Sequence, residues 1–384
     1  MPQTLTPLTI HVVSDSREFD ELQPAWTALQ AASLDSSIFL SWDWQRLWWE
    51  HYGAHRQLRI LVAGDAQGVV GLLPLYLETQ RRARGAMAIR KLRQIGVGGD
   101  TSPDDLGGLF VPGQETPVAA AMARFLAHGL GAWDVLDFCD LPADSPLALS
   151  LGGELSTQGL RVCSRLGDPI TFGDLPTDWE TYRQGLSRNR RETMRRKRKK
   201  FEAQPGARFR IVDSSQELAQ SFEHLVRLHH LRWSERTERP GFSTPQYQGF
   251  HRDLMQALLP QGRLRLLALE LGDQPIAMLY GYLYKRRFSF FQSGFDPAHA
   301  EYSPGDVLMS YAVEYAISQA CTVFDMLKGD HDYKRHFFQQ DRRNLEIRVF
   351  RRGLIDLVYR LHDALRPGAA FTTASSSGLS GPPS

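Results

Sequence analysis

The chain has 384 residues, a formal net charge of +2, 42% hydrophobic and 23% charged residues, a composition typical of a globular protein large enough for two domains. No apolar run is long enough to cross a bilayer, and the first residues lack the pattern of a signal peptide. We therefore expect a cytoplasmic protein without a transmembrane segment. The only cysteines, Cys139, Cys163 and Cys321, are too widely scattered to indicate a disulfide framework or a zinc site, so no metal is expected.

The first half of the chain alternates between helical and extended patterns. Residues 38–52 predict a helix with an aromatic face, and residues 58–77 predict two strands joined by a turn at 64–68. A helix rich in alanine over 116–129 then precedes a buried strand over 133–138. The order strand, strand, helix, strand indicates an α/β fold with a mixed sheet.

The second half repeats this order. Residues 264–284 again read as a strand, a Gly-Asp-Gln turn and a strand, a helix pattern covers 306–320, and residues 322–327 form a buried strand. Self-similarity of this kind indicates an internal duplication. We therefore predict two similar domains.

The domain boundaries follow from composition. Residues 160–178 contain two glycines and two prolines and are expected to link the domains. The first domain then spans 8–166 and the second spans 167–366. Residues 367–384 are too poor in large apolar side chains to support a core and are predicted to be a disordered tail.

A dense basic segment opens the second domain. From Arg188 to Lys200, nine of thirteen residues are arginine or lysine and Glu192 is the only acid. Like charges on one helix repel one another, so a bound anion would stabilise the segment, and Arg195 and Lys199 are candidate substrate-binding residues. A solvated surface helix explains the same pattern equally well.

The segment from Phe288 to Phe338 carries the strongest indication of a functional site. A strand over 288–294, a loop rich in turn residues, the helix pattern and the strand that follows it predict two neighbouring parallel strands. This arrangement directs the amino end of the helix, with its unpaired N–H groups, at the loop after the first strand, where an anion can bind. The alternative is that Ser303 only caps the helix and Pro304 occupies its first turn.

Polar residues follow the second of these strands. They are Lys328, Asp330, His331, Asp332, Tyr333 and Lys334. Open α/β sheets usually bind ligands at the carboxyl ends of their strands, so this cluster is expected to line a site. An ion cluster that only fixes the loop would give the same pattern.

Several stretches together resemble one known family. FFQSGFDPAHAEYSPGDVLMSYAVEYAI and FDMLKGDHDYKRHF are similar to the signature of the CelD-like acetyltransferase domain of bacterial GNAT-related proteins, found near polysaccharide and cellulose synthesis genes. The stretches WDWQRLWWEHYG, NRRETMRRKRKK and RLRLLALELGDQPIAMLYGY also match, so the resemblance runs from about Phe39 to Phe350. The duplicated layout also resembles the tandem GNAT folds of the Fem-type peptidyltransferases.

The resemblance implies two tandem GNAT-like acyltransferase domains, the first degenerate and the second catalytic. It implies acetyl-CoA or another acyl-CoA as donor, and an amine or hydroxyl of a small molecule or sugar as acceptor. The residues that it assigns to the donor are Gln292, Ser293 and Gly294 along the acyl group, and Ser303, Gly305, Asp306 and Val307 at the phosphates. The acceptor side would be lined by the polar cluster, with Lys328 and Lys334 as substrate-binding residues.

The catalytic assignment concerns two proton transfers. On this mapping Asp330 is the predicted base for the acceptor amine, and Tyr333 is the predicted acid for the leaving thiolate. Because Lys328 and Lys334 stabilise the charged carboxylate, His331 is a competing base.

The sequence leaves the donor open between two classes. The usual GNAT phosphate loop has Gln or Arg, two residues, Gly, one residue, then Gly or Ala, whereas this chain has Glu301-Tyr302-Ser303-Pro304-Gly305-Asp306. Its two acids would repel a pyrophosphate. Aminoacyl-tRNA, the donor of Fem-type relatives, is therefore the alternative, with the basic segment as its contact. A third hypothesis is a non-catalytic accessory protein of a polysaccharide synthesis complex.

Overall fold

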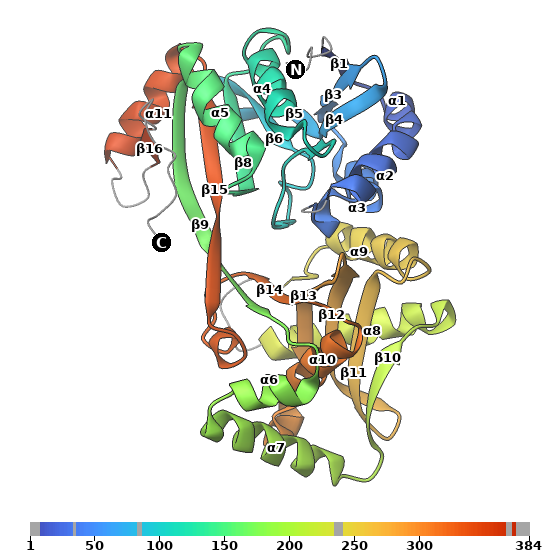
Figure 1. The fold of residues 1–384 in the computed structure, drawn as a ribbon. Helices are drawn as coiled ribbons and strands as arrows, with labels where there is room; N and C mark the ends of the chain where they lie inside the picture. Colours follow the sequence, from blue (N-terminus) through green and yellow to red (C-terminus); the bar gives the residue numbers. More distant parts are fainter. Residues whose placement is uncertain (1–7, 34–35, 83–86, 234–240, 366–370, 374–384) are drawn as a thin grey trace, which may run out of the picture. The chain divides into compact units, whose positions relative to one another are not determined.

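The computed structural model describes residues 8–33, 36–82, 87–233, 241–365 and 371–373. These residues form two compact units, which Figure 1 shows coloured along the chain. The first unit contains the residues up to Asp168 and those from Arg343 onward, and the second unit runs from Pro169 to Arg342. The second unit is thus an insertion within the sequence of the first.

The first unit combines helices with two sheets. Its helices are α1 (Ser16–Glu21), α2 (Gln23–Ala32), α3 (Trp42–Tyr52), α4 (Glu115–His128), α5 (Pro146–Thr157) and α11 (Leu354–Leu365), with a 3-10 turn η1 (Ile38–Leu40). Its strands are β1 (Thr9–Val13), β2 (Gln57–Leu58), β3 (Ile60–Asp65), β4 (Gly68–Leu73), β5 (Leu75–Arg82), β6 (Met87–Gln94), β7 (Leu109–Phe110), β8 (Val135–Pro142), β9 (Arg161–Asp174), β15 (Gln340–Phe350) and β16 (Thr372–Thr373). Strands β9 and β15 are the two segments that pass from one unit to the other.

The first unit has one antiparallel sheet and one mixed sheet, and the sequence predicted a mixed sheet. One sheet has the order β1-β3-β4-β7, and the other contains β9-β15-β8-β6-β5-β2. Within the second sheet β6 and β8 are parallel, whereas β15 and β8 are antiparallel. The structure places Arg343 and the described residues that follow it in the first unit, where β15 pairs with β8 from Asn344 to Phe350, although the sequence assigned residues up to 366 to the second domain.

Two other expectations differ from the structure. The stretch 160–178 is largely strand β9 and not a linker, and its Gly173 is required by packing, since a Cβ atom there would lie 2.0 Å from the Phe338 ring. In the predicted disordered tail, Thr372 and Thr373 pair with β9. Residues 367–370 and 374–384 of that tail lie outside the described residues.

The second unit has one sheet flanked by helices. Its strands are β10 (Ala207–Val212), β11 (Leu264–Leu271), β12 (Gln274–Tyr284), β13 (Arg287–Phe295) and β14 (Val323–Lys328). Its helices are α6 (Trp179–Gly185), α7 (Arg188–Glu202), α8 (Ser215–Trp233), α9 (Pro245–Leu258) and α10 (Pro304–Ser318), with 3-10 turns η3 (Pro297–Tyr302) and η4 (Lys334–His336). The strand order is β10-β11-β12-β13-β14 followed by the end of β9, and of these neighbouring strands, as far as the structure describes them, only β13 and β14 are parallel. The predicted parallel pair with a helix between its strands is therefore confirmed.

Helices cover both faces of this sheet. Because side chains alternate along a strand, Ala277 and Leu279 of β12 pack in one cluster with the apolar residues of α10. Tyr280 points to the other face, where its hydroxyl lies 3.3 Å from Nδ1 of His251 on α9. Both faces of β12 are buried, which explains its nearly continuous apolar sequence.

Candidate active site

The site begins where the parallel strands β13 and β14 separate. The strands pair only from Arg287 to Ser289 and from Val323 to Asp325. Beyond this point β13 carries a bulge, because Phe290 and Gln292 pair with consecutive residues of β12 and Phe291 is the extra residue between them. The two strands therefore diverge toward their carboxyl ends and leave a wedge-shaped opening.

Side chains satisfy the backbone of β14 where β13 no longer does. The buried carboxylate of Asp325 accepts a hydrogen bond of 2.8 Å from the Leu327 N–H, and Leu327 has a φ of 55°, which is strained for a branched side chain. The ammonium of Lys334, which is 2% exposed, donates to the carbonyls of Leu327 at 2.7 Å and Lys328 at 3.0 Å. Lys334 thus supports the end of β14, and it also lines the larger of the two cavities described next, so its role in substrate binding stays a prediction.

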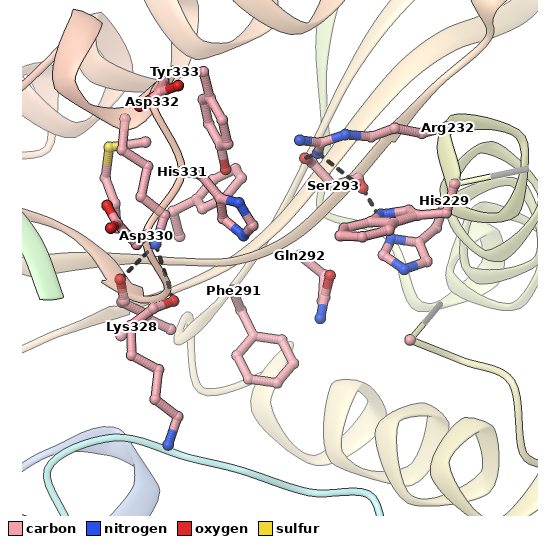
Figure 2. A pocket seen from close by; sticks show the side chains of 16 residues that line it. His229, Arg232, Phe291, Gln292, Ser293, Lys328, Asp330, His331, Asp332 and Tyr333 are labelled. Atoms are coloured by element: carbon pink, nitrogen blue, oxygen red, sulfur yellow. Dashed lines mark hydrogen bonds between the residues drawn. The ribbon is translucent and has the colours of Figure 1, made fainter. Parts of the chain in front are cut away.

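Two cavities occupy the opening, both within the second unit. The larger has a volume of about 560 Å³ and is lined from β13, α8 and the loop after β14; Figure 2 shows His229 and Arg232 on one side, and Lys328, Asp330 and His331 on the other. The smaller has a volume of about 400 Å³ and lies at the amino end of α10. Both are lined by Arg232, Phe290, Ser293 and Tyr333. The cavities therefore meet at these four side chains.

Arg232 places a fixed positive charge at this junction. Its Nη1 donates a 2.6 Å hydrogen bond to Oγ of Ser293, and its guanidinium lies 5.6 Å from the Phe295 ring centre and 5.4 Å from that of Tyr333. Two aromatic rings and a hydroxyl thus hold the guanidinium in place. Of the described side chains that line the cavities, Arg232 is the only cation common to both.

His229 lies beside Arg232 on α8 and is 1% exposed. Its Nδ1 lies 3.0 Å from the Ser293 carbonyl, which can only accept, so Nδ1 carries the proton and Nε2 carries a lone pair. Burial lowers the pKa of His229 to about 4, with only partial compensation from the Ser293 carbonyl, so the ring is neutral near pH 7. Nε2 is buried without a hydrogen-bond partner in the described part of the chain.

Gly294 permits the contact between α8 and β13. A Cβ atom at this position would lie 2.2 Å from the backbone nitrogen of His229. The glycine therefore brings His229 and Arg232 up to the strand. Gln292, Ser293 and Gly294, all predicted along the acyl group, line the cavities, Gln292 the larger, Gly294 the smaller and Ser293 both.

The predicted phosphate residues lie at the smaller cavity with one exception. Ser303, Gly305 and Asp306 line it. Ser303 is the first flanking residue of α10, but its side chain makes no capping hydrogen bond. Val307 does not line the cavity, because its side chain is 1% exposed in the core and its N–H donates to the Ser303 carbonyl at 3.1 Å.

The basic helix α7 has an inner and an outer face. On the inner face Lys197 lines the smaller cavity and forms an ion pair with Asp306, and Lys200 lies 3.6 Å from Glu301. The two acids that depart from the usual phosphate loop are therefore neutralised by lysines. The candidate residues Arg195 and Lys199 are exposed on the outer face and line neither cavity.

The polar cluster after β14 lines the larger cavity, as expected from the sequence. Lys328, Asp330, His331 and Tyr333 all belong to its wall. The carboxylate of Asp330 is 72% exposed and lies 3.6 Å from Arg335, and the rings of His331 and Tyr333 are stacked 6.0 Å apart. The cluster is thus brought together at one cavity, whereas Arg232 and Lys197, which also line the cavities, were not among the predicted site residues.

The described ranges of the chain contain no group of histidine, cysteine and acidic side chains arranged to hold a metal ion. They also contain no helix long and apolar enough to cross a membrane.

Comparison with known proteins agrees with this geometry. Residues 188–335 match the family model described as "Acetyltransferase (GNAT) domain". The second unit has the fold of a GNAT-type acyltransferase. No curated protein sequence matches the chain.

Solved structures extend the likeness to both units. The crystal structure of FemX superposes with a TM-score of 0.58 at 11% identity, covering 92% of this chain and 99% of that one. The C-terminal domain of a protein described as a lysylphosphatidylglycerol synthetase from Agrobacterium fabrum gives a TM-score of 0.51 at 12% identity, with 91% and 97% covered. A conserved protein of unknown function from Bacteroides thetaiotaomicron gives 0.53 at 10% identity, with 89% and 100% covered. At such identities these matches establish the fold alone.

Proposed function

We propose that the protein is an acyltransferase that moves an acyl group from acyl-CoA to an amine or hydroxyl of a small molecule or sugar. The observation that carries the proposal is the pair of cavities that meet where β13 and β14 separate. A transfer reaction needs two substrates that enter separately and react at a shared point, and this arrangement provides one. The donor would occupy the smaller cavity and the acceptor the larger.

The smaller cavity suits a donor that carries phosphate. It combines the amino end of α10 with the ammonium of Lys197, and both favour a negative charge. Lys197 is paired with Asp306, so a donor phosphate would compete with this carboxylate for the same ammonium. The acyl end would then reach Ser293 at the junction of the cavities.

Arg232 is proposed to stabilise the transition state. Attack by the acceptor converts the thioester carbonyl into a tetrahedral intermediate whose oxygen carries a negative charge; the carbon–sulfur bond then breaks. A guanidinium already fixed at the junction could accept this charge without rearrangement. The backbone N–H groups near the bulge at Phe291 are the complementary donors expected for a GNAT-type fold.

Proton transfer completes the reaction. The acceptor loses a proton to a base, and the leaving thiolate gains one from an acid. Tyr333 borders both cavities, which suits the acid. Asp330 and His331 remain the proposed bases in the larger cavity, and loss of kcat by about two orders of magnitude in Asp330→Asn, at unchanged donor affinity, would support the carboxylate.

A Fem-like transfer from aminoacyl-tRNA is the second candidate. It is favoured by the FemX-like fold and by the outer face of α7, where Arg195, Arg196 and Lys199 are exposed and have no ion-pair partner in the described part of the chain. Such a face could follow a nucleic-acid backbone. The setting proposed from the CelD-like resemblance is polysaccharide or cell-envelope biosynthesis in the cytoplasm, where an accessory role without catalysis is the remaining alternative.

Ligand-linked stabilisation tests the donor directly. We expect acetyl-CoA or a longer acyl-CoA to raise the melting temperature of the wild-type protein, because a ligand that binds only the folded state stabilises it. Calorimetry then gives the affinity, and assays with amines and amino sugars give the acceptor. Stabilisation by tRNA but by no acyl-CoA would favour the Fem-like reaction. If neither ligand raises the melting temperature, both donor assignments are wrong.

A further inference from the structure

The last helix of the first unit presents an apolar face to the outside. Four large side chains of α11 recur at helical spacing and are exposed, Leu354 at 70%, Leu357 at 52%, Val358 at 37% and Leu361 at 58%. Among the described residues only two other large hydrophobic side chains, Leu149 and Leu166, are comparably exposed. A contiguous stripe of this kind on a folded protein marks a surface that binds something.

The opposite face of α11 is fixed to the first unit. Ile355 and Tyr359 pack with Phe350 of β15, and the carboxylate of Asp356, 7% exposed, pairs with Arg161 and Arg360. The helix is therefore anchored with its apolar stripe outward. The stripe is not the result of a helix that has detached from its core.

Near the stripe the arginine side chains are more exposed than the carboxylates with which they pair. Arg360 on α11 is 56% exposed and Arg165 on β9 is 40% exposed, whereas their acidic partners Asp356 and Glu346 are 7% and 22% exposed. Arg352 at the start of the helix is also exposed. Arg360 thus lies on the same helix as the stripe and Arg165 lies on β9, which contacts α11, and each guanidinium is more exposed than its carboxylate partner.

Two candidate occupants fit this surface poorly. Residues 374–384 contain one large apolar side chain, Leu379, against the four of the stripe. A second copy related by two-fold symmetry would bring the same arginines toward one another. An anionic lipid surface offers acyl chains for the stripe and phosphates for the arginines.

The geometry points to α11 as an interfacial helix that docks the protein on anionic lipid bilayers. The apolar stripe would enter the boundary between headgroups and acyl chains, and Arg352, Arg360 and Arg165 would contact the lipid phosphates. A single short helix gives reversible attachment that weakens with salt. This inference does not depend on the proposed transfer reaction.

Vesicle cosedimentation of the full chain tests the inference. We expect binding to vesicles of phosphatidylglycerol and phosphatidylcholine, little binding to phosphatidylcholine alone, and release as salt is raised. Leu357→Ser with Leu361→Ser should weaken binding about tenfold or more. Leu149→Ser, which removes an exposed leucine of α5 outside the stripe, should bind like wild type.

A second variant guards against misfolding. Leu354→Glu alters the most exposed residue of the stripe and should also weaken binding while the melting temperature stays at the wild-type value. Equal binding by wild type and the stripe variants, or no binding at any lipid concentration, would overturn the proposal. A dimer in analytical ultracentrifugation that the stripe variants dissociate would also overturn it and assign the face to a second copy.

Discussion

In the part of the chain that the structure describes, each unit contains one pair of parallel strands that separate; the opening is filled in the first unit and holds cavities in the second. In the first unit β6 and β8 pair from Lys91 to Arg93, and in the second β13 and β14 pair over an equal length. Where the parallel strands still pair, the two units carry similar ion pairs. Asp137 on β8 pairs with Arg93 and Arg348, as Asp325 on β14 pairs with Arg287 and Arg342.

Above the base the two wedges differ. In the first unit the Gln94 side chain accepts a 2.8 Å hydrogen bond from the Cys139 N–H, and the Leu106 N–H donates to the Asp140 carbonyl at 2.9 Å. One side chain and one returning loop thus satisfy the separated strand. In the second unit the ammonium of Lys334 donates to the backbone of β14, and no loop of the described residues fills the space beside it, so cavities remain. The same strand geometry can therefore serve as core or as site, depending on what fills the opening.

The shared base of the wedges gives the largest expected effect. Asp325→Ala and Asp137→Ala should each lower the free energy of unfolding by about 3 to 4 kcal/mol, because each leaves buried or half-buried arginines without their carboxylate. Urea unfolding measures both, with Asp273→Ala as the control, since that carboxylate is 97% exposed. A loss at only one of the two positions would break the comparison.

Catalysis should depend on Arg232, which lies at the opening between β13 and β14 in the second unit. Arg232→Gln is expected to lower kcat by about two to three orders of magnitude, with little change in donor affinity. Arg227→Gln, on the same helix but outside both cavities, is the matched control. Arg232→Lys should recover part of the rate; a KM effect with normal kcat would instead make Arg232 a binding residue.

Acid should affect the second unit at higher pH than the first. The pKa of His229 is about 4 in the folded protein and 6.5 as its ordinary value, so its contribution to stability is complete above pH 6.5 and decreases as the pH falls toward 4, by about 3 kcal/mol in total. In the first unit burial would raise the pKa of Asp137, but Arg348 and Arg93 hold it below its ordinary value, so its contribution is lost only at lower pH.

Unfolding measured between pH 6.5 and pH 4 shows which unit loses stability first. Tryptophan fluorescence and hydrogen exchange resolved by peptide should show the second unit losing protection first. His229→Asn should flatten the pH dependence between 6.5 and 4. An unchanged slope in this variant would show that other groups cause the acid response.

The smallest effect is expected at the lysine of the smaller cavity. Lys197→Gln should weaken acyl-CoA binding about tenfold, and Asp306→Asn, which removes the competing carboxylate, should strengthen it. Replacing Arg195 and Lys199 by Gln on the outer face is the control and should leave acyl-CoA affinity unchanged. If this outer pair alone reduces binding, and only of tRNA, the donor assignment moves to the Fem-like alternative.

The elements of the site were predictable because their signals are local. A few consecutive residues are enough to indicate each of them: the aromatic strand β13, the turn residues before α10 and the buried strand β14. Strand β9 was missed because Gly173 and Pro169 resemble linker residues, whereas Gly173 makes room for Phe338 far along the chain. When a glycine is required by a residue far away in the sequence, its sequence neighbours do not show the reason.

The residues that complete the site were missed for the same reason. Arg232 contacts Ser293 and Lys197 contacts Asp306, pairs that only the fold brings together. One signal for Lys197 was present. Met194 and Phe201, seven residues apart, mark the buried face of α7, and Lys197 lies between them at helical spacing on that face.

The insertion of the second unit within the first sets an order of assembly during translation. In the sheet of the first unit, β15 lies between β8 and β9. The ribosome makes β8 and β9 first, then all of residues 169–342, and only then β15. At ordinary synthesis rates of about 5 to 20 residues per second this interval lasts on the order of ten seconds or more.

During that interval β8 and β9 each have an unpaired edge. Open edges of apolar strands invite pairing with other chains. The nascent protein therefore needs either rapid folding of the second unit, which would bring β15 to its place promptly, or protection by a chaperone. A circular permutant that begins at Pro176, between β9 and α6, and joins Ser384 to Met1 would make β15 before β8 and β9, and it should aggregate less when expressed.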